Sequence, residues 1–436
     1  MIRILFLWGL NILVVAAASA QELTLDSALA IALKNNLGLK ISRNTVSIAG
    51  INNSYGIAGG LPLVYGSASG TEQLTSIEQR YSNPLNNKSS QNALSTNMQA
   101  AVAANMVIFG GGRVVNTKHQ LEEIEVQAQQ LMDSRAQNLM YNVMLKYYDI
   151  VRQQTYAKTL LASIAASQQR LDIVKKQQAV GVANDADLFQ SQVDLNTQIQ
   201  NLQAQQLIVD QGKTDLLTLL TLRPDSTLTI SDTIRVDRSL HLDSVLLTVN
   251  RNPDVQAAYQ QILINQYIQK EVGAQRYPSL TGNAGYSFNR TNNQAGFNLF
   301  NQSYGPYLGL GLTIPIFNGN IYKKQQQIAG INIQTATLQR DTLLLNINSS
   351  AVKGWQAYQN NLEQLETAQQ NYDLSQKLLD LVMKRFQYKQ ATIVDVKNAQ
   401  QSFENAGYLL VNISYAAKVS EIQLKRLGSG LTFPAQ

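Results

Sequence analysis

The chain contains one unit of sequence twice, at residues 108–220 and 316–428. Each copy opens with an apolar and aromatic pair that runs into glycine, I-F-G-G-G-R from Ile108 and I-F-N-G-N from Ile316. Each continues as a long Gln-, Ala- and Leu-rich stretch without proline, then a short turn, then a second helical run that begins at Asp187 or Asp395. The offset between the copies is 208 residues throughout. A repeat of this length restricts the fold to one in which the same group of elements occurs twice.

The duplication extends to the opening helices. Residues 22–36 read E-L-T-L-D-S-A-L-A-I-A-L-K-N-N, which predicts an amphipathic helix with Asp26 as its N-cap. The same text returns as L-H-L-D-S-V-L from Leu240, and a further helix is expected in each copy, at 37–59 and 254–275. The sequence therefore predicts a first structural repeat at residues 21–239 and a second at 240–436.

Residues 1–20 have the pattern of a secretory signal peptide. Arg3 precedes a mostly apolar stretch, and Ala18-Ser19-Ala20 forms a small-residue cleavage site. An N-terminal membrane anchor is the alternative, which the shortness of the apolar stretch disfavours. No later run reaches about 18 apolar residues, so any membrane would have to be crossed as strands.

The composition narrows the classes of function. Charged residues make up 15% of the chain, against roughly 25% in typical soluble domains. Polarity comes from Gln, Asn, Ser and Thr instead, which suits surfaces that face other copies of the chain or line a wet interior. The net charge of +6 is spread along the chain, and nucleic-acid binding normally needs a clustered basic patch. The absence of cysteine excludes disulfides and thiolate metal sites.

Four segments alternate between apolar and polar residues, as strands with two different faces do. They are 61–70, 97–108, 278–290 and 305–317, with Asn/Ser-rich loops expected at 82–91 and 291–303. The clearest alternation sets Leu308, Leu310 and Leu312 against Gly309 and Gly311. Segments of about ten residues with one apolar face are typical of transmembrane barrels. The alternative is a half-buried sheet in a soluble core, for which the chain offers no separate apolar segment as a cover.

Four strands cannot close a barrel, and open sheet edges are not tolerated in lipid. Several copies of the chain must therefore combine if the strands cross a membrane. The long helices carry apolar residues at the 3–4 spacing of coiled coils, among them Leu195, Val209 and Leu216, with Gln192 and Gln206 at intervening seam positions. This pattern predicts a structural role for the helix side chains.

No catalytic or metal-binding constellation emerges from the sequence. The two histidines, His119 and His241, lack partner histidines or carboxylate clusters. Gly110-Gly111-Gly112 precedes a helix and could hold phosphate. The second copy keeps only one of these glycines, so a tight turn is the better interpretation. The acidic pair Asp185 and Asp187 is interpreted as helix capping, and we expect neither an enzyme nor a cofactor.

These features together resemble the TolC-type outer-membrane efflux family along residues 23–427. The resemblance is carried by the opening L-T-L-D-S-A-L-A-I-A-L-K-N-N, its echo at Leu240, the two glycine turns and T-I-V-D-V from Thr392. It implies a mainly α chain with four strands and long coiled-coil helices. Three such chains would form a homotrimer with a 12-stranded transmembrane β-barrel in outer-membrane lipid and a 12-helix tunnel across the periplasm. Such channels dock with an inner-membrane pump through a periplasmic adaptor protein, and they export drugs or secreted polypeptides.

The same resemblance suggests site residues. The helix turns of the family form a periplasmic gate, and Asp187, Thr392 and Asp395 match its polar gate residues by position. Asn398 stands where some members have a second acidic ring.

The chain departs from the family at the latch of that gate. Phe386 and Ala391 stand where the family often has Tyr and Arg as latch partners. Lys384, Arg385 and Lys389 are therefore candidate substitutes for the latch.

The leading prediction is a passive outer-membrane export duct of a tripartite efflux or type I secretion system. A periplasmic coiled-coil structural or adhesion protein, with the alternating segments as a soluble sheet, is the second class. A secreted enzyme is the third, and the lack of a catalytic constellation disfavours it.

Overall fold

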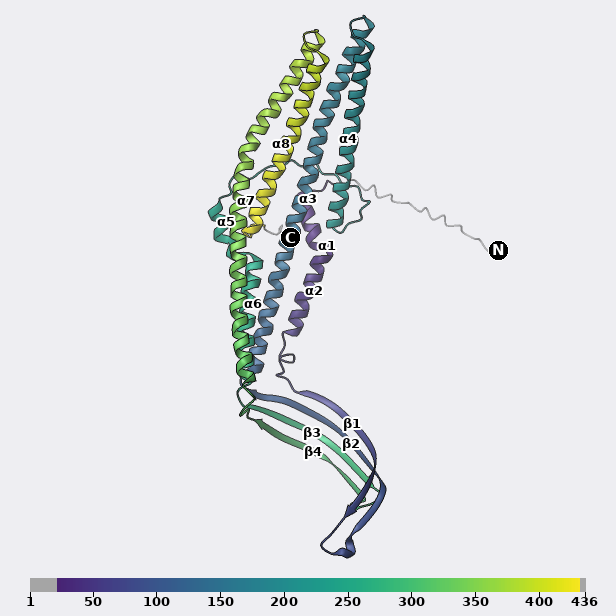
Figure 1. Ribbon diagram of the computed structural model, residues 1–436, viewed down its shortest axis with the longest axis vertical. Coiled ribbons are helices and arrows are strands. Elements are labelled where there is room, and N and C mark those ends of the chain that lie inside the picture. The colour runs from purple at the N-terminus through teal and green to yellow at the C-terminus, as the bar shows by residue number, and fades with distance from the viewer. Residues whose placement is uncertain (1–21, 432–436) are drawn as a thin grey trace, which may run out of the picture. The chain divides into compact units, whose positions relative to one another are not determined.

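The computed structural model describes residues 22–431 (Figure 1). The predicted signal peptide, residues 1–20, lies outside the described residues. These described residues are mostly helical, at 65%, and contain one sheet of four strands. The long elements are β1 Leu63–Gln79, β2 Lys88–Gly110, α3 Arg113–Ala179, α4 Asp185–Leu219, β3 Ser279–Asn293, β4 Phe300–Thr313, α7 Ile321–Gln387 and α8 Ile393–Leu427. The shorter helices are α1 Leu25–Asn35, α2 Leu37–Asn52, α5 Leu242–Thr248 and α6 Pro253–Ala274, with 3-10 turns η1 Pro84–Asn86 and η2 Val249–Arg251.

In residues 22–431, none of the helices combines the length and the apolarity that a membrane span requires.

The described elements occur twice in the same order. The series α1, α2, β1, β2, α3 and α4 is followed by α5, α6, β3, β4, α7 and α8 in the same order. The helices α3 and α7 each have 67 residues, and α4 and α8 each have 35. Their first residues, Arg113 and Ile321 or Asp185 and Ile393, are separated by the same 208 residues that the sequence comparison gives.

The described chain divides into two compact units, and both repeats contribute to each. The helical unit contains residues up to 40, 135–252 and those from 346 onward, and the sheet unit contains 41–134 and 253–345. The helical unit therefore holds the hairpins formed by α3 with α4 and by α7 with α8. The sheet unit holds the four strands, most of α2, all of α6 and the first turns of α3 and α7.

Helix α8 connects the two hairpins of the helical unit. It packs on α7 through an apolar cluster that includes Phe386, Val396 and Phe403. It also approaches α3 so closely that a Cβ on Gly407 would lie 2.5 Å from Thr159 Cγ2. A residue larger than glycine would separate the helices there, so Gly407 allows this close packing of α8 on α3.

The seam of α4 differs from the prediction in its polar members. Leu195, Val209 and Leu216 are buried as expected, but Gln192 and Gln206 are exposed, and Ser191 and Gln205 are buried in their place. Both buried side chains find partners: the Ser191 hydroxyl donates to Asp187 O at 2.8 Å, and Gln205 Nε2 donates to Gln153 Oε1 at 2.7 Å. A helix of 3.6 residues per turn drifts against a 3.5-residue pattern, so which polar neighbour enters the seam depends on the partner helix.

Two helix boundaries also differ from the prediction. Thr24, rather than Asp26, is the N-cap of α1, and its hydroxyl accepts from the Ser27 N–H at 3.3 Å. Asp26 lies in the first turn instead, where a carboxylate suits the helix dipole. Helix α2 ends at Asn52 and not near residue 59, because the following Gly-rich segment forms turns in which Gly59 has a φ of +79°.

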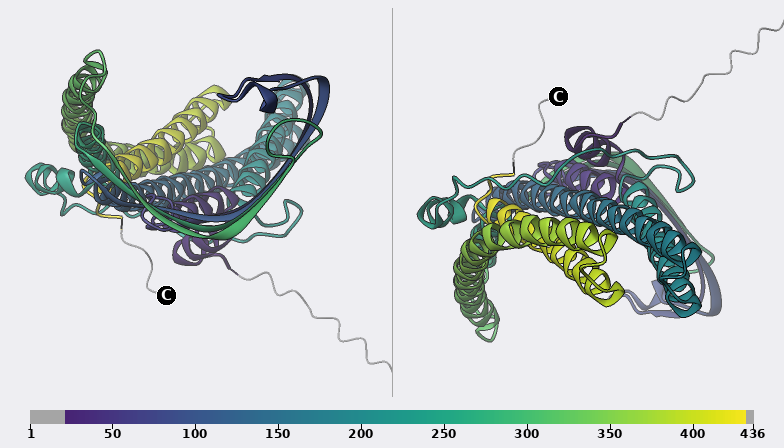
Figure 2. Two further views of the ribbon diagram at one scale, coloured as in Figure 1. Left: turned by 90° about the horizontal axis from the view of Figure 1, so that it is seen from below. Right: turned by 90° about the horizontal axis from the view of Figure 1, so that it is seen from above.

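The sheet is antiparallel with the order β1-β2-β3-β4, and Figure 2 shows that its strands are curved. The strands begin or end several residues away from the predicted limits, because regular pairing continues into the Asn/Ser-rich sequence that was expected to form loops. Strand β4 ends at Thr313 and excludes Ile314 and Ile316. Pro315 between them cannot donate a ladder hydrogen bond, which explains the early end.

The register confirms the alternation. It aligns Val102 with Tyr286, Ala104 with Ala284 and Leu308, and Met106 with Gly282 and Leu310. We call this side of the sheet the apolar face. Its largest side chains are solvent-exposed in the single chain, and Leu308 is 85% exposed. The opposite side, which carries Asn105, Asn283 and their row neighbours, is the polar face. Within the described residues, no other element of the chain therefore covers the apolar face of the sheet.

Candidate functional site

The two turns that end the helical hairpins are built alike. In the first, Val182 N–H donates to Gln177 O at 2.8 Å, and Gly181 has a φ of +73°. In the second, Gln390 N–H donates to Arg385 O at 2.8 Å, and Lys389 has a φ of +60°. Both are the left-handed helix ending that usually contains glycine. Lys389 therefore occupies a glycine position, and its backbone is strained there.

The predicted gate residues lie directly after these turns, at the start of α4 and α8. Asn184 Oδ1 accepts from Asp187 N–H at 2.8 Å, and Thr392 Oγ1 accepts from Asp395 N–H at 3.2 Å. Asp395 also closes a capping box, because its Oδ2 accepts from the Thr392 N–H at 2.8 Å. Asp187 and Asp395 thus lie in the first turns of the return helices, but these helices begin two residues earlier than predicted, at Asp185 and Ile393.

Asp395 combines this role with full exposure. Hydrogen bonds from the Thr392 backbone, then from its hydroxyl, and the more distant Arg385 charge lower the pKa of the Asp395 carboxyl below its usual value. The side chain is therefore a persistent negative charge on the solvent side of the turn. Asn398 lies one helical turn further along α8, where its carbonyl oxygen accepts from the Ser402 hydroxyl at 2.9 Å.

The candidate latch residues gather at the end of α7. Lys384 and Arg385 lie in the last turn of this helix, where positive charge suits the helix dipole. Arg385 Nη2 donates to Gln390 O at 3.0 Å and so supports the turn itself. Lys389 follows within the turn. Within one chain, the contacts of Arg385 are local and stabilise the turn.

Phe386 and Ala391, where the sequence departs from the family pattern, are both part of apolar packing. Phe386 is 6% exposed and belongs to the cluster with Val174, Met383 and Phe403, and Ala391 packs against that cluster. The end of the α7–α8 hairpin is therefore joined to α3 by apolar contacts.

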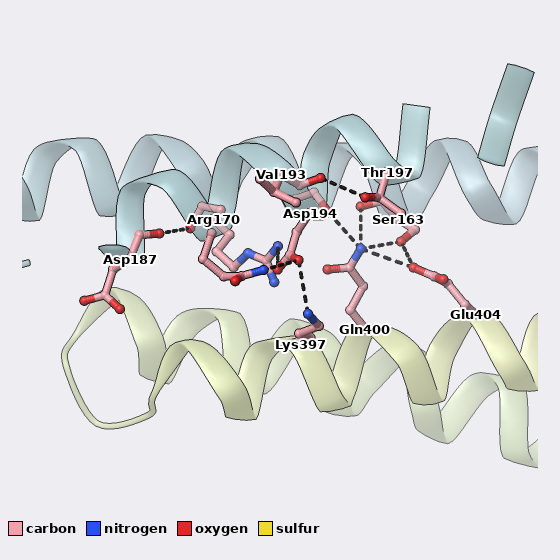
Figure 3. Close-up of polar contacts among 12 residues, drawn as sticks. Ser163, Arg170, Asp187, Val193, Asp194, Thr197, Lys397, Gln400 and Glu404 are labelled. Atoms are coloured by element: carbon pink, nitrogen blue, oxygen red, sulfur yellow. Dashed lines mark hydrogen bonds and ion pairs between the residues drawn. The ribbon is translucent and has the colours of Figure 1, made fainter. Parts of the chain in front are cut away.

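Sequence reasoning missed an ionic cluster close to the turns (Figure 3). Arg170 of α3 is 1% exposed, and its Nη2 lies 2.9 Å from Asp194 Oδ2 of α4. Lys397 of α8 reaches the other oxygen of the same carboxylate, with Nζ 3.1 Å from Oδ1. One carboxylate thus joins three helices and both hairpins.

The cluster borders a cavity of about 220 Å³ whose lining also includes Gln198 and Gln401. Burial is the main cause that lowers the pKa of Arg170, and the Asp194 charge opposes this effect. Arg170 Nε and Nη1 have no hydrogen-bond partner among the described residues. The buried guanidinium therefore depends mainly on its hydrogen-bonded carboxylate, Asp194, while Glu404 adds a more distant negative charge.

A second polar group follows on α8. The buried Gln400 donates from Nε2 to Ser163 Oγ at 2.6 Å and to Ser167 Oγ at 2.8 Å, and the Ser163 hydroxyl donates to Glu404 (Figure 3). An arginine and a glutamine inside a Leu/Val seam were the available sequence signal. Arg170 follows the spacing of the buried Leu171 and Val174 on α3, and Gln400 follows that of the buried Val396 and Phe403 on α8. Burial of a charged residue is uncommon enough, however, that the sequence pattern predicts a solvated face for Arg170.

Comparison with known proteins is consistent with this architecture. The family model described as outer membrane efflux protein matches residues 247–429. "Toxin and drug export protein A" of Aggregatibacter actinomycetemcomitans is 22% identical over 312 residues, which are 70% of this chain. The chain spans 66% of that relative's length.

Two solved structures share the fold. The outer membrane channel CmeC of Campylobacter jejuni superposes with a TM-score of 0.76 at 17% identity, over 94% of this chain and 87% of that one. The outer membrane protein VceC of Vibrio cholerae superposes with a TM-score of 0.74 at 18% identity, over 93% and 96%. These similarities cover both repeats and both compact units.

Proposed function

Because this chain belongs to the outer membrane efflux protein family, we propose that three copies of it form a passive export duct from the periplasm to the exterior. The duct is the outer-membrane part of a tripartite efflux or type I secretion system. In this proposal the protein carries out no chemistry and holds no cofactor, and it provides a continuous path for cargo.

The observation that carries the proposal is the sheet with two unlike faces and two unpaired edges. Strands β1 and β4 each have one neighbour within the chain. The apolar face exposes large side chains, which lipid would cover at low cost. Because lipid does not tolerate open sheet edges, β4 of one copy must pair with β1 of another. Four strands per chain and three copies give the 12-stranded barrel that the family resemblance implies.

The helical hairpins support the same stoichiometry. Each chain supplies two hairpins, α3 with α4 and α7 with α8. Three chains would therefore supply the 12 helices that form the wall of the tunnel. The exposed polar surface of these hairpins, rich in Gln, Asn and Ser, suits a water-filled interior. The low share of charged residues has the same explanation.

The constriction of the duct is proposed at the hairpin turns. Three copies each of Asp187, Thr392, Asp395 and Asn398 would line it, with Asp395 as its main charge. Lys384, Arg385 and Lys389 lie next to these residues and are the proposed partners across the interface between copies. The Arg170–Asp194–Lys397 cluster supports the gate from within each chain, because it joins the two hairpins that would have to separate when the gate widens.

The proposed partners are a periplasmic adaptor protein and an inner-membrane pump. The relative named as a toxin and drug export protein agrees with a route for small molecules, polypeptides or both. The pump would supply the driving force and much of the selection, since the duct has no site for chemistry in this proposal.

Cell fractionation together with planar-bilayer recording tests the proposal. The duct should partition with the outer membrane, need detergent for extraction, and conduct ions as a discrete channel after reconstitution. Release by osmotic shock and failure to conduct would contradict it. That outcome would favour the structural or adhesion protein of the periplasm.

A further inference from the structure

The polar face of the sheet carries no charged side chain over the part in which the strands pair regularly. From the row that contains Leu63, Asn105, Asn283 and Gly309 to the register shift after Thr75, every position on this face is Asn, Gln, Ser, Thr, Gly, Ala, Tyr or Leu. This statement concerns described strand residues only, all of which lie within 22–431. Because all four strands lack charged residues on this side, the whole paired part of the polar face is uncharged.

The charges of these strands lie elsewhere. Glu72 pairs with Thr96, and Arg290 pairs with Met98 and Gln302, which places both charged residues in rows of the apolar face near its loop end. Charged side chains at that level reach the polar boundary of a membrane. Lys88 is the first charged residue on the polar side, but it lies beyond the register shift and its Nζ is 3.4 Å from Gly296 O of the β3–β4 loop.

The polar face is instead linked across strands by neutral hydrogen bonds. Asn105 Nδ2 donates to Tyr65 Oη at 3.1 Å between β2 and β1. Ser95 Oγ donates to Asn293 Oδ1 at 2.6 Å between β2 and β3. Thr281 Oγ1 donates to Gly311 O at 3.2 Å between β3 and β4. These bonds run along the sheet, so they hold the side chains against the wall and leave a surface of fixed dipoles.

Pores that select ions by charge are built with rings of charged side chains. A wall of amides and hydroxyls has no fixed charge to concentrate one sign of ion or to hold a multivalent ion of either sign. It still replaces part of the hydration of a polar solute through its donors and acceptors.

We infer that the section of the duct formed by the sheet is indifferent to the charge of its cargo, so that all discrimination by charge occurs in the helical part. This inference rests on the proposed barrel, in which the polar face lines the lumen. The cargo class that fits such a lining is polar and hydrogen-bonding, through amide or hydroxyl groups, and of either charge sign or none.

The test uses the double variant Asp187→Asn with Asp395→Asn as the background, so that the proposed carboxylate rings at the helix turns do not contribute. Hexaamminecobalt(III) is added from the exterior side of reconstituted channels. We expect no block of the current in this background. Gln99→Glu is then added, which places three carboxylates on the polar face in the row of Ser69 and Asn289. This variant should show a voltage-dependent block, and its reversal potential should shift toward the value of a cation-selective channel.

Gln302→Glu is the matched control, because the same change then lies on the apolar face beside Arg290. It should leave block and reversal potential unchanged. Exterior block already present in the double-variant background at the level of the Gln99→Glu variant would overturn the inference, and so would equal effects of Gln99→Glu and Gln302→Glu. A failure of the unmodified protein to form channels would instead contradict the proposed duct itself.

Discussion

At the scale of single residues, Asp395 is both a helix cap and a candidate pore charge. Its carboxylate accepts hydrogen bonds from the N–H and the hydroxyl of Thr392, yet the side chain is fully exposed. Capping uses Oδ2 and leaves Oδ1 toward solvent. A ring of three such carboxylates would attract cations even though the chain as a whole carries a net charge of +6.

Asp395→Asn should lower cation selectivity and weaken the block by multivalent cations added from the periplasmic side by severalfold. Asparagine keeps the shape of the cap, so the loss of charge is the main change. Planar-bilayer recording measures both effects. Asp185→Asn, in the first turn of α4, is the control and should change them less. Unchanged block in Asp395→Asn would leave the residue as a helix cap only.

The pH dependence of that block follows from the lowered pKa of Asp395. A carboxyl with a lowered pKa in the folded state keeps its charge below the usual value of 3.8. Its contribution to helix stability is present above the unfolded-state pKa and is lost as the pH falls through the lowered, folded-state pKa. Titration of the block should therefore show a midpoint below pH 3.8. A midpoint at or above that value would mean that repulsion among the three carboxylates of the ring outweighs the capping hydrogen bonds.

Lys389 offers a test of backbone strain. Its φ of +60° costs a non-glycine residue about 1 kcal/mol, so Lys389→Gly should stabilise the α7–α8 turn by about that amount. Hydrogen exchange of the turn amides measures the change. Gly181→Ala, at the equivalent position of the other hairpin, should destabilise its turn by a similar amount. Faster exchange in Lys389→Gly would show that the lysine side chain stabilises the turn more than its backbone strains it.

At the scale of elements, the helices of the two hairpins are joined by both apolar and ionic contacts. Phe386, Val396 and Phe403 join α7 to α8, and Asp194 joins α4 to Arg170 of α3 and Lys397 of α8. The sheet is different, because its strands join the two repeats through regular pairing of β2 with β3. The hairpins can therefore move only when side-chain contacts break, whereas the sheet stays continuous.

Asp194→Asn should destabilise the helical unit by about 3–5 kcal/mol, because it leaves the buried Arg170 guanidinium without its counter-charge. Thermal unfolding of the assembled protein should occur at a lower temperature. The channel should also open more often, because the contact between the two hairpins is weaker. Asp210→Asn is the control. Asp210 forms an ion pair with Lys213, but its side chain is 71% exposed, so the stability should change by no more than about 1 kcal/mol. Equal effects of the two variants would show that the cluster is solvated in the assembly.

Leu308→Arg tests which face of the sheet meets lipid. Leu308 lies in the middle part of β4 on the apolar face, where a charge at the bilayer midplane costs about 2–4 kcal/mol. The yield of folded oligomer, measured by heat-modifiable migration, should fall. Ser303→Arg, on the same strand but on the polar face, should be tolerated better. The opposite order of yields would mean that the faces are assigned the wrong way round.

At the scale of the whole molecule, the described chain is incomplete as a membrane protein. Its sheet has two unpaired edges, and its apolar face has no protein cover. Purified protein in detergent should therefore have a native mass divisible by three chains. A stable monomer or dimer would contradict both the barrel and the tunnel. Mixing the chain with the Leu308→Arg variant at known ratios should reduce the yield cooperatively, since one defective copy breaks closure.

The local pattern of the sequence determined most of the elements. Helix periodicity and strand alternation depend on neighbours a few residues apart, and these interactions act whatever the rest of the chain does. The offset of 208 residues placed the long helices of both copies correctly. Asp187 and Asp395 were placed near the start of the return helices for the same reason.

Only the tertiary structure decided which polar residues enter the seams. Arg170 and Gln400 are buried because Asp194, Ser163 and Ser167 from other helices meet them there, and no spacing within one helix specifies such partners. Strand ends depended in the same way on pairing, which extended β1 to Gln79 and began β2 at Lys88, inside the Asn/Ser-rich segment that was expected to form a loop. Long-range contacts add free energy that local propensity does not contain, and they select among alternatives that the sequence pattern leaves open.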